Sequence, residues 1–131
     1  MRILGIDHGL AHLGLASGDT ESKLALPLDT IHEKELEQQV ATVADIVLEE
    51  DVEAIVVGFP LSMEGDALEQ AEKTQEFIDA LAEVVKIPIH QEDERFSSEF
   101  AKRQKQEDPD GKFDEHALAA AAILQTYLER A

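Results

Sequence analysis

The sequence predicts a single α/β domain with a mixed five-stranded sheet, and three observations support this fold class. The chain has 131 residues, a length typical of one ordinary domain. It opens with two apolar segments separated by glycines, as in a β-hairpin. Apolar runs then alternate with segments of helical periodicity, without a linker, repeat or low-complexity stretch. We therefore assign residues 1–131 to one domain, in which an antiparallel hairpin precedes parallel strands and about four helices flank the sheet.

The first half of the chain predicts three strands and a helix. Met1–Ile6 and Leu13–Ser17 are short and mostly apolar, and glycines mark the turn between them. A third extended segment spans Leu24–Ile31, where a proline excludes a helix. Thr30 to Glu33 has the spacing of a capping box, and apolar residues follow it at helical intervals. We expect a helix over residues 33–50.

The middle of the chain predicts a buried strand, a helix and an edge strand. Ala54–Val57 is a continuous apolar run, typical of a strand covered on both faces. Asp66 and Glu69 can cap the helix that follows. Ile87–His90 is a short strand whose proline favours the edge of the sheet. The apolar residues that share one face of the helix are Ala71, Ile78, Leu81, Ala82 and Val85.

Two further helices complete the chain. Ser97 or Ser98 can cap a helix that continues to about Gln106, and the turn-forming residues 107–111 then interrupt the chain. The last helix spans about Asp114 to Arg130. Its four consecutive alanines, residues 119–122, give it a thin face that can lie close to a sheet.

The charge and composition exclude several classes of protein. The chain has 11 Lys and Arg against 29 Asp and Glu, so its net charge is −18. Such an excess repels a polyanion at long range and argues against nucleic acid as a partner. The absence of cysteine excludes disulfides and thiolate sites. No signal peptide is recognisable, and no apolar run approaches the ~18–20 residues that span a bilayer. We expect a soluble, cytoplasmic protein with no membrane partner.

Two groups of residues near strand ends are candidates for chemistry. Asp7 ends the first strand, and Gly9 and Gly14 follow it; glycines let the backbone approach a ligand closely, and a carboxylate at this place suits metal or phosphate chemistry. The alternative is an ordinary turn aspartate. The run Glu92-Asp93-Glu94-Arg95 follows the predicted strand Ile87–His90, and a bound cation would stabilise its three carboxylates. The alternative is a solvated loop.

A third group, Asp114-Glu115-His116, opens the last helix. The helix dipole favours acids in a first turn, which is a complete structural explanation for Asp114 and Glu115. A protonated histidine gains nothing at a helix N-terminus, so His116 is available as a neutral ligand or base, although a lone histidine is more often structural.

Considered together, these groups and the segments between them resemble the YqgF (RuvX) family of Holliday-junction-resolvase-like proteins, which are implicated as nucleases that mature the 5′ end of pre-16S ribosomal RNA. The resemblance covers nearly the whole chain in order. The segments that carry it are Asp7-His8-Gly9 with Gly14, Val56 to Gly65, Ala71-Glu72-Lys73, Asp93-Glu94-Arg95, and Ala121 to Gln125 with Tyr127-Leu128.

The resemblance implies an RNase H-like fold and hydrolysis of a phosphodiester bond with Mg²⁺ or Mn²⁺. In that chemistry carboxylates hold one or two divalent ions, which activate water and stabilise charge on the scissile phosphate. Asp7 matches the family's first-strand aspartate, and Glu94 matches the glutamate of its D-E-R motif, so both are expected to be metal ligands. Arg95 is expected to orient Glu94 or contact phosphate; alternatively it forms a simple ion pair.

The chain departs from the family pattern at two places. His116 stands where the family usually has an aspartate; an imidazole can ligate a metal, suits Mn²⁺ better than Mg²⁺, and removes one negative charge. Asp114, two residues before His116, is a further candidate ligand, although on a helix it points about 200° away from the direction of His116. Ala11 and His12 replace a basic pair in the first loop, which weakens the attraction for phosphate.

One segment is locally basic. Residues 95–112 contain five Lys and Arg against four acids. Within it Lys102, Arg103 and Lys105 lie in one turn of the expected helix and are candidates to guide a phosphate backbone, together with Arg95, Gly9 and Gly14; a solubilising helix face is the alternative.

Two functions follow. The first is a metal-dependent nuclease of pre-rRNA or branched DNA, monomeric or weakly dimeric, with Asp7, Glu94 and His116 as catalytic metal ligands. The second is a catalytically impaired family member that serves as a nucleic-acid-binding or ribosome-assembly factor. The Asp7–Gly14 loop also resembles the phosphate loop of actin-like ATPases and sugar kinases, but those enzymes need two lobes, which 131 residues cannot supply.

Overall fold

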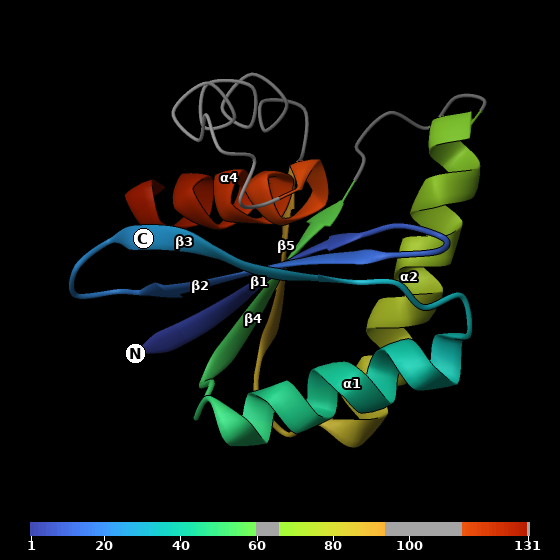
Figure 1. Ribbon diagram of the computed structural model, residues 1–131, viewed down its shortest axis with the longest axis horizontal. Helices are drawn as coiled ribbons and strands as arrows, with labels where there is room; N and C mark the ends of the chain where they lie inside the picture. Colours follow the sequence, from blue (N-terminus) through green and yellow to red (C-terminus); the bar gives the residue numbers. More distant parts are fainter. Residues whose placement is uncertain (60–65, 94–113, 131) are drawn as a thin grey trace.

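A computed structural model describes residues 1–59, 66–93 and 114–130, and the sheet in it has five strands (Figure 1). The strand order is β3-β2-β1-β4-β5. The antiparallel half consists of β1 (Arg2–His8), β2 (Leu13–Asp19) and β3 (Leu24–Ile31). The parallel half adds β4 (Ala54–Phe59) and β5 (Ile89–Asp93) beside β1. The predicted change from an antiparallel opening to parallel strands is confirmed.

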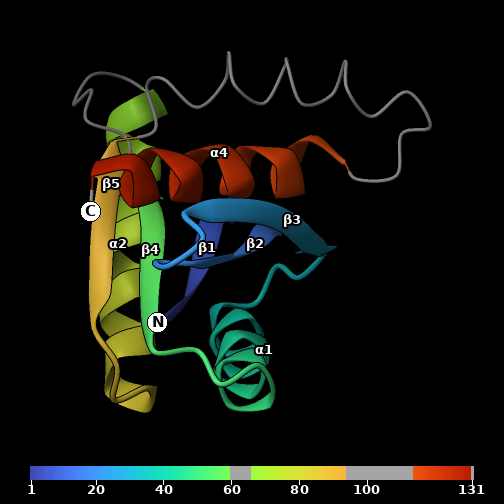
Figure 2. The ribbon, with the colours of Figure 1, turned by 90° about the vertical axis from the view of Figure 1, so that its left-hand side faces the viewer.

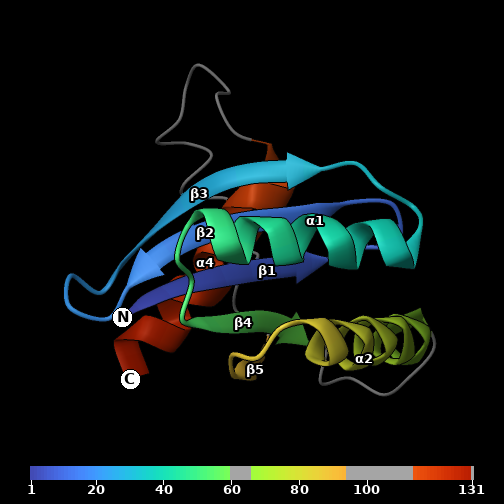
Figure 3. The ribbon, with the colours of Figure 1, turned by 90° about the horizontal axis from the view of Figure 1, so that it is seen from below.

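Three described helices cover the two faces of this sheet: α1 (Leu36–Glu49), α2 (Asp66–Val84) and α4 (Glu115–Arg130). Figure 2 shows α4 on one face, with α1 and α2 on the other, and Figure 3 shows α1 and α2 in front of the sheet. The predicted helix from Ser97 or Ser98 to Gln106 lies outside the described residues. In the ranges that the structure describes, no helix is long and apolar enough to cross a membrane.

Successive side chains of a strand point to opposite faces of the sheet, so each strand contributes to both apolar layers. In β1, Leu4 and Ile6 pack with α1 and α2, whereas Ile3 packs with α4. The α4 layer is thin because alanines at 120–122 are fully buried against the sheet. A Cβ added to Gly5 would lie 2.7 Å from the Cβ of Leu124, so α4 rests almost on the backbone of β1. The alanine-rich face of α4 therefore lies close to the sheet, as the sequence predicts.

Three local predictions are wrong. The capping box at Thr30 does not form, because Thr30 belongs to β3 and α1 begins at Leu36, after Glu35, whose side chain makes no capping hydrogen bond. Ala82 is exposed, and the buried face of α2 contains Thr74 and Phe77 instead. Strand β5 starts two residues later than predicted and continues to Asp93, although its position at the edge of the sheet is as the proline indicated.

Candidate functional site

Asp7 is the side chain at the carboxyl end of the central strand that faces α4. It lies on the same side of β1 as Ile3 and Gly5, which both contact α4. Its Oδ2 atom is 4.0 Å from Nδ1 of His116, the second residue of α4. The Asp7 and His116 side chains are 22% and 27% exposed, so solvent and a ligand can reach both of them. Two residues 109 positions apart in the sequence therefore form one polar pair at the edge of the sheet.

The first turn of α4 is held in place by Asp114. Its Oδ1 atom accepts hydrogen bonds from the backbone N–H of His116 at 3.1 Å and of Ala117 at 3.2 Å. The hydroxyl of Thr30 on β3 donates to the same oxygen. Asp114 is thus the N-cap of α4 and also ties the helix to the far strand of the antiparallel half. Burial alone would raise the pKa of Asp114, but these hydrogen bonds outweigh it and hold the pKa below its usual value.

Close backbone packing also fixes the position of His116. A Cβ added to Gly14 on β2 would lie 1.9 Å from the carbonyl oxygen of His116. Only glycine leaves room for α4 to approach β2 this closely. Because Gly14 pairs with Asp7 in the β1–β2 ladder, this contact brings the start of α4 to the Asp7 strand position.

A second imidazole lies against His116. The ring centroids of His12 and His116 are 3.5 Å apart, and the rings are tilted by 34°. Burial, followed by the neighbouring imidazoles of His116 and His32, lowers the pKa of His12 below its usual value. His12 is therefore mostly neutral at pH 7 and adds little positive charge beside Asp7 and His116.

The loop between β1 and β2 is anchored by a glutamine that the sequence analysis did not single out. Gly9 N–H donates to the carbonyl of His12 at 2.9 Å. The buried Gln39 amide donates to the carbonyls of Gly9 and Glu33, at 3.4 and 2.8 Å. Gln39 is a polar residue within the apolar face of α1, and that anomaly was the available signal for its role.

His8 forms a buried polar cluster on the other face of β1. Its Nδ1 atom is 3.1 Å from the hydroxyl of Thr74 on α2, and its ring stacks on Phe77 at 4.7 Å. The Gln70 amide donates to the His8 carbonyl at 3.0 Å and to the Thr74 hydroxyl at 3.1 Å. Burial, the largest influence, lowers the pKa of His8 to about 4. Neutral His8 therefore links the end of β1 to α2, a role that sequence reasoning missed.

The run that begins at Glu92 is not a solvated loop throughout. Glu92 belongs to β5, is almost fully buried, and pairs with Arg130 near the end of α4. This pairing supplies a structural reason for one of the three adjacent carboxylates, since a buried charge needs a partner. Asp93 ends β5, and Glu94 follows directly in the sequence.

The structure brings together five of the predicted site residues, namely Asp7, Gly9, Gly14, Asp114 and His116, at the β1–β2–α4 junction. The others, Glu94, Arg95, Lys102, Arg103 and Lys105, lie outside the described residues. Across the described ranges, no group of three or more His, Asp or Glu side chains is arranged to hold a metal ion.

Three comparisons relate this chain to known proteins. The RuvX family, described as Holliday junction resolvase, matches residues 1–130. A Chloroflexus aggregans protein named "Putative pre-16S rRNA nuclease" is 39% identical, covering 97% of this chain and 92% of that protein. A protein of the same name from Fusobacterium nucleatum is 36% identical, covering 98% and 96%.

Solved structures with the same fold are more distant in sequence. Thermus thermophilus RuvC in complex with a Holliday junction substrate superposes with a TM-score of 0.69 at 18% identity, over 99% of this chain and 95% of that one. The fowlpox virus resolvase in complex with Holliday junction DNA has a TM-score of 0.56 at 12% identity, over 99% and 98% of the two chains. These similarities establish a RuvC-like, RNase H-like fold.

Proposed function

The chain belongs to the RuvX family, and from this membership we propose that it is a metal-dependent nuclease that hydrolyses phosphodiester bonds in structured nucleic acid. We propose pre-16S ribosomal RNA as its substrate, because two relatives are named "Putative pre-16S rRNA nuclease", and maturation of the 5′ end of that RNA as its reaction. The partner is then a nucleic acid, and the protein acts in the cytoplasm as a monomer or weak homodimer.

The observation that carries this proposal is the Asp7–His116 pair. A carboxylate at the carboxyl end of a central strand lies within 4.0 Å of an imidazole on the facing helix, and both are open to solvent. The donor set suits a divalent cation in part, since one oxygen and one nitrogen ligand are already adjacent. Glu94, the residue after β5, is proposed as the third ligand and Asp114 as a supplementary one.

A bound Mg²⁺ or Mn²⁺ would supply Lewis acidity toward the scissile phosphate and an activated water. The chain's own residues prepare the site for that cation. Asp114 and Gly14 hold the backbone of His116, which places its imidazole 4.0 Å from the Asp7 carboxylate before any cation binds. Neutral His12 leaves the cation without a competing positive charge beside it. Arg95, Lys102, Arg103 and Lys105 are proposed to contact the phosphate backbone, together with the backbone of Gly9 and Gly14.

Cleavage assays test the proposal. Pre-16S RNA, branched DNA and single-stranded controls are incubated with Mg²⁺ or Mn²⁺, using the wild type, Asp7→Asn and the matched surface variant Asp45→Asn, which changes an exposed acid on α1. We expect cleavage by the wild type and Asp45→Asn and at least about a hundredfold loss in Asp7→Asn. Cleavage that survives in Asp7→Asn would refute the assignment.

Thermal melting provides a second readout of the same site. A cation that binds only the folded state at a hundred times its Kd stabilises it by about 2.7 kcal/mol. Mn²⁺ should therefore raise the melting temperature of the wild type and of Asp45→Asn, but not that of Asp7→Asn. Equal melting temperatures of the wild type with and without the metal would count against a metal site.

The replacement of the family's aspartate by His116 favours one alternative, a catalytically impaired member that binds nucleic acid or assists ribosome assembly. Loss of one negative charge weakens the hold on a divalent ion. Binding of pre-16S RNA without cleavage under every metal condition would support this alternative over the nuclease.

A further inference from the structure

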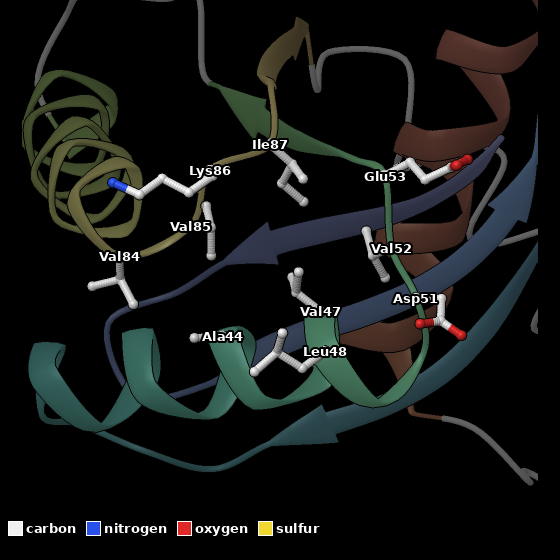
Figure 4. A pocket seen from close by; sticks show the side chains of 10 residues that line it. All are labelled: Ala44, Val47, Leu48, Asp51, Val52, Glu53, Val84, Val85, Lys86 and Ile87. Carbon is white, nitrogen blue, oxygen red and sulfur yellow. The ribbon is translucent and has the colours of Figure 1, made fainter.

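An apolar groove lies at the end of the sheet opposite to Asp7. It is bounded by the last turns of α1, the start of β4, and the segment that leads from α2 into β5 (Figure 4). Its volume is about 560 Å³. In Figure 4 the side chains of Val47, Val52, Val85 and Ile87 turn toward the centre of this space.

Two large apolar side chains at this groove are exposed to water. Leu48 on α1 is 78% exposed and Val84 on α2 is 54% exposed. They stand beside Val47 and Val85, which are buried in the core, so the groove continues the hydrophobic core out to the surface. A contiguous apolar surface of this kind marks an interaction site, because covering it removes apolar area from water.

The electrostatics around the groove select a cationic occupant. Asp51 lines it, and Glu49 and Glu83 lie next to lining residues on α1 and α2. Among the described residues, no ion pair neutralises these three acids. Two neighbouring acids are paired, Glu50 with Arg2 and Glu53 with the N-terminal amine. Neither α1 nor α2 carries a basic residue in its last turn, so two negative helix-dipole ends converge here. Lys86 is the one cation among the described lining residues.

We propose that this groove binds a cationic amphipathic helix of a partner protein. Apolar side chains at i, i+3 or i+4 and i+7 would enter the groove, and Lys or Arg beside them would meet the acidic rim. A second copy of this chain is disfavoured, because a two-fold contact would oppose identical acidic rims. Nucleic acid is disfavoured by the same charges. The inference does not depend on the nuclease assignment, because the groove lies at the end of the sheet opposite to Asp7.

A synthetic peptide tests the proposal. The probe is a fluorescent helical peptide with Leu at i, i+3 and i+7 and Lys at the exposed positions, and its binding is followed by fluorescence anisotropy. The groove variant is Leu48→Gln with Val84→Thr, both exposed positions. The matched control is Leu26→Gln, an exposed leucine on β3 outside the groove. Circular dichroism verifies that each variant is folded.

We expect the groove variant to bind the peptide at least about tenfold more weakly than the wild type, and Leu26→Gln to bind it unchanged. Asp51→Asn with Glu49→Gln should weaken binding severalfold and reduce its salt dependence. A peptide with Glu in place of Lys should not bind. Absence of wild-type binding, equal binding by the groove variant, or equal binding of the acidic peptide would overturn the proposal. So would a dimer in analytical ultracentrifugation that the groove variant abolishes.

Discussion

At the scale of single residues, the chemistry of the candidate site depends on which side chain faces Asp7. An aspartate there would place two carboxylates together, which a cation would have to neutralise, whereas Nδ1 of His116 lies 4.0 Å from the Asp7 carboxylate and can serve as a neutral nitrogen ligand for a cation. Mg²⁺ prefers oxygen ligands in octahedral geometry, while Mn²⁺ accepts imidazole more readily. If the proposed site binds a cation, His116 should therefore shift its preference from Mg²⁺ toward Mn²⁺.

Replacing His116 tests this dependence. In His116→Asp we expect the affinity for Mg²⁺ to rise relative to that for Mn²⁺, because the variant supplies a second carboxylate. Isothermal titration with each metal measures the ratio, and His116→Ala serves as the control that removes the ligand altogether. A ratio of affinities that is the same in the wild type, His116→Asp and His116→Ala would exclude His116 from the metal site.

The buried His8 predicts a pH dependence of stability. The pKa of His8 is about 4 in the folded protein and about 6.5 when unfolded, so between these values the unfolded chain binds the proton more readily. The contribution of neutral His8 to the free energy of unfolding is therefore full well above pH 6.5 and decreases as the pH falls, by about 2 kcal/mol at pH 5. Urea unfolding at pH 7.5 and pH 5 measures the loss.

His8→Gln is the matched control, since glutamine retains hydrogen bonding but does not titrate. Its stability should fall less than that of the wild type over the same pH interval. An equal fall in both proteins would assign the acid sensitivity to other groups, such as the many carboxylates.

At the scale of elements, the start of α4 is the feature on which the site depends. Asp114 is the N-cap, and it also accepts a hydrogen bond from Thr30 on β3. Replacement of an N-cap aspartate by alanine costs ~1 kcal/mol. We expect Asp114→Ala to lose about that much stability in urea unfolding and to bind Mn²⁺ more weakly, because His116 loses its backbone anchor.

Asp114→Asn separates the cap from the charge. Asparagine caps helices about as well as aspartate, so this variant should retain most of the stability. If Asp114 is also a metal ligand, Asp114→Asn should still lose Mn²⁺ affinity. Equal stability of the Ala and Asn variants would show that the cap contributes little.

Elements with strong local signals were predictable from the sequence. The limits of β3 and the type of every described strand and helix follow from apolar periodicity and breakers, and the alanine run correctly indicated a helix lying close to the sheet. The start of α1 was not predictable, since Thr30 uses its hydroxyl for Asp114, which is distant in sequence. Likewise, nothing local to Glu92 indicates that its partner is Arg130.

The same distinction applies to the candidate site. Asp7, Gly14 and His116 could be selected from residue type and position at element ends, and the structure places them together. The roles of His12, Gln39 and Thr74 depend on contacts between elements that are distant in the sequence. Neither hydrophobic periodicity nor a sequence motif predicts which side chains will meet in such contacts. Gln39 and Thr74 are buried polar residues on otherwise apolar helix faces, and this feature could have indicated their hydrogen-bonding roles.

At the scale of the whole molecule, the net charge of −18 opposes the compact state. Like charges on a small surface repel one another, and at 0.01 M salt this repulsion extends over about 30 Å, whereas at 1 M it extends over about 3 Å. We therefore expect the melting temperature to rise as NaCl increases from low to molar concentration, because screening relieves the folded state more than the expanded unfolded chain. Differential scanning calorimetry across a salt series measures this.

A variant with fewer surface acids tests whether repulsion is the cause. Asp45→Asn, Glu49→Gln and Glu83→Gln remove three exposed negative charges that form no ion pair with other described residues. The triple variant should melt at a higher temperature than the wild type at low salt and respond less to added NaCl, so that the two curves converge at high salt. If the two curves are parallel, the salt effect arises from exclusion of salt from the protein surface and not from screening of these charges. If the melting temperature of the wild type falls as salt is added, attractive ion pairs outweigh the repulsion.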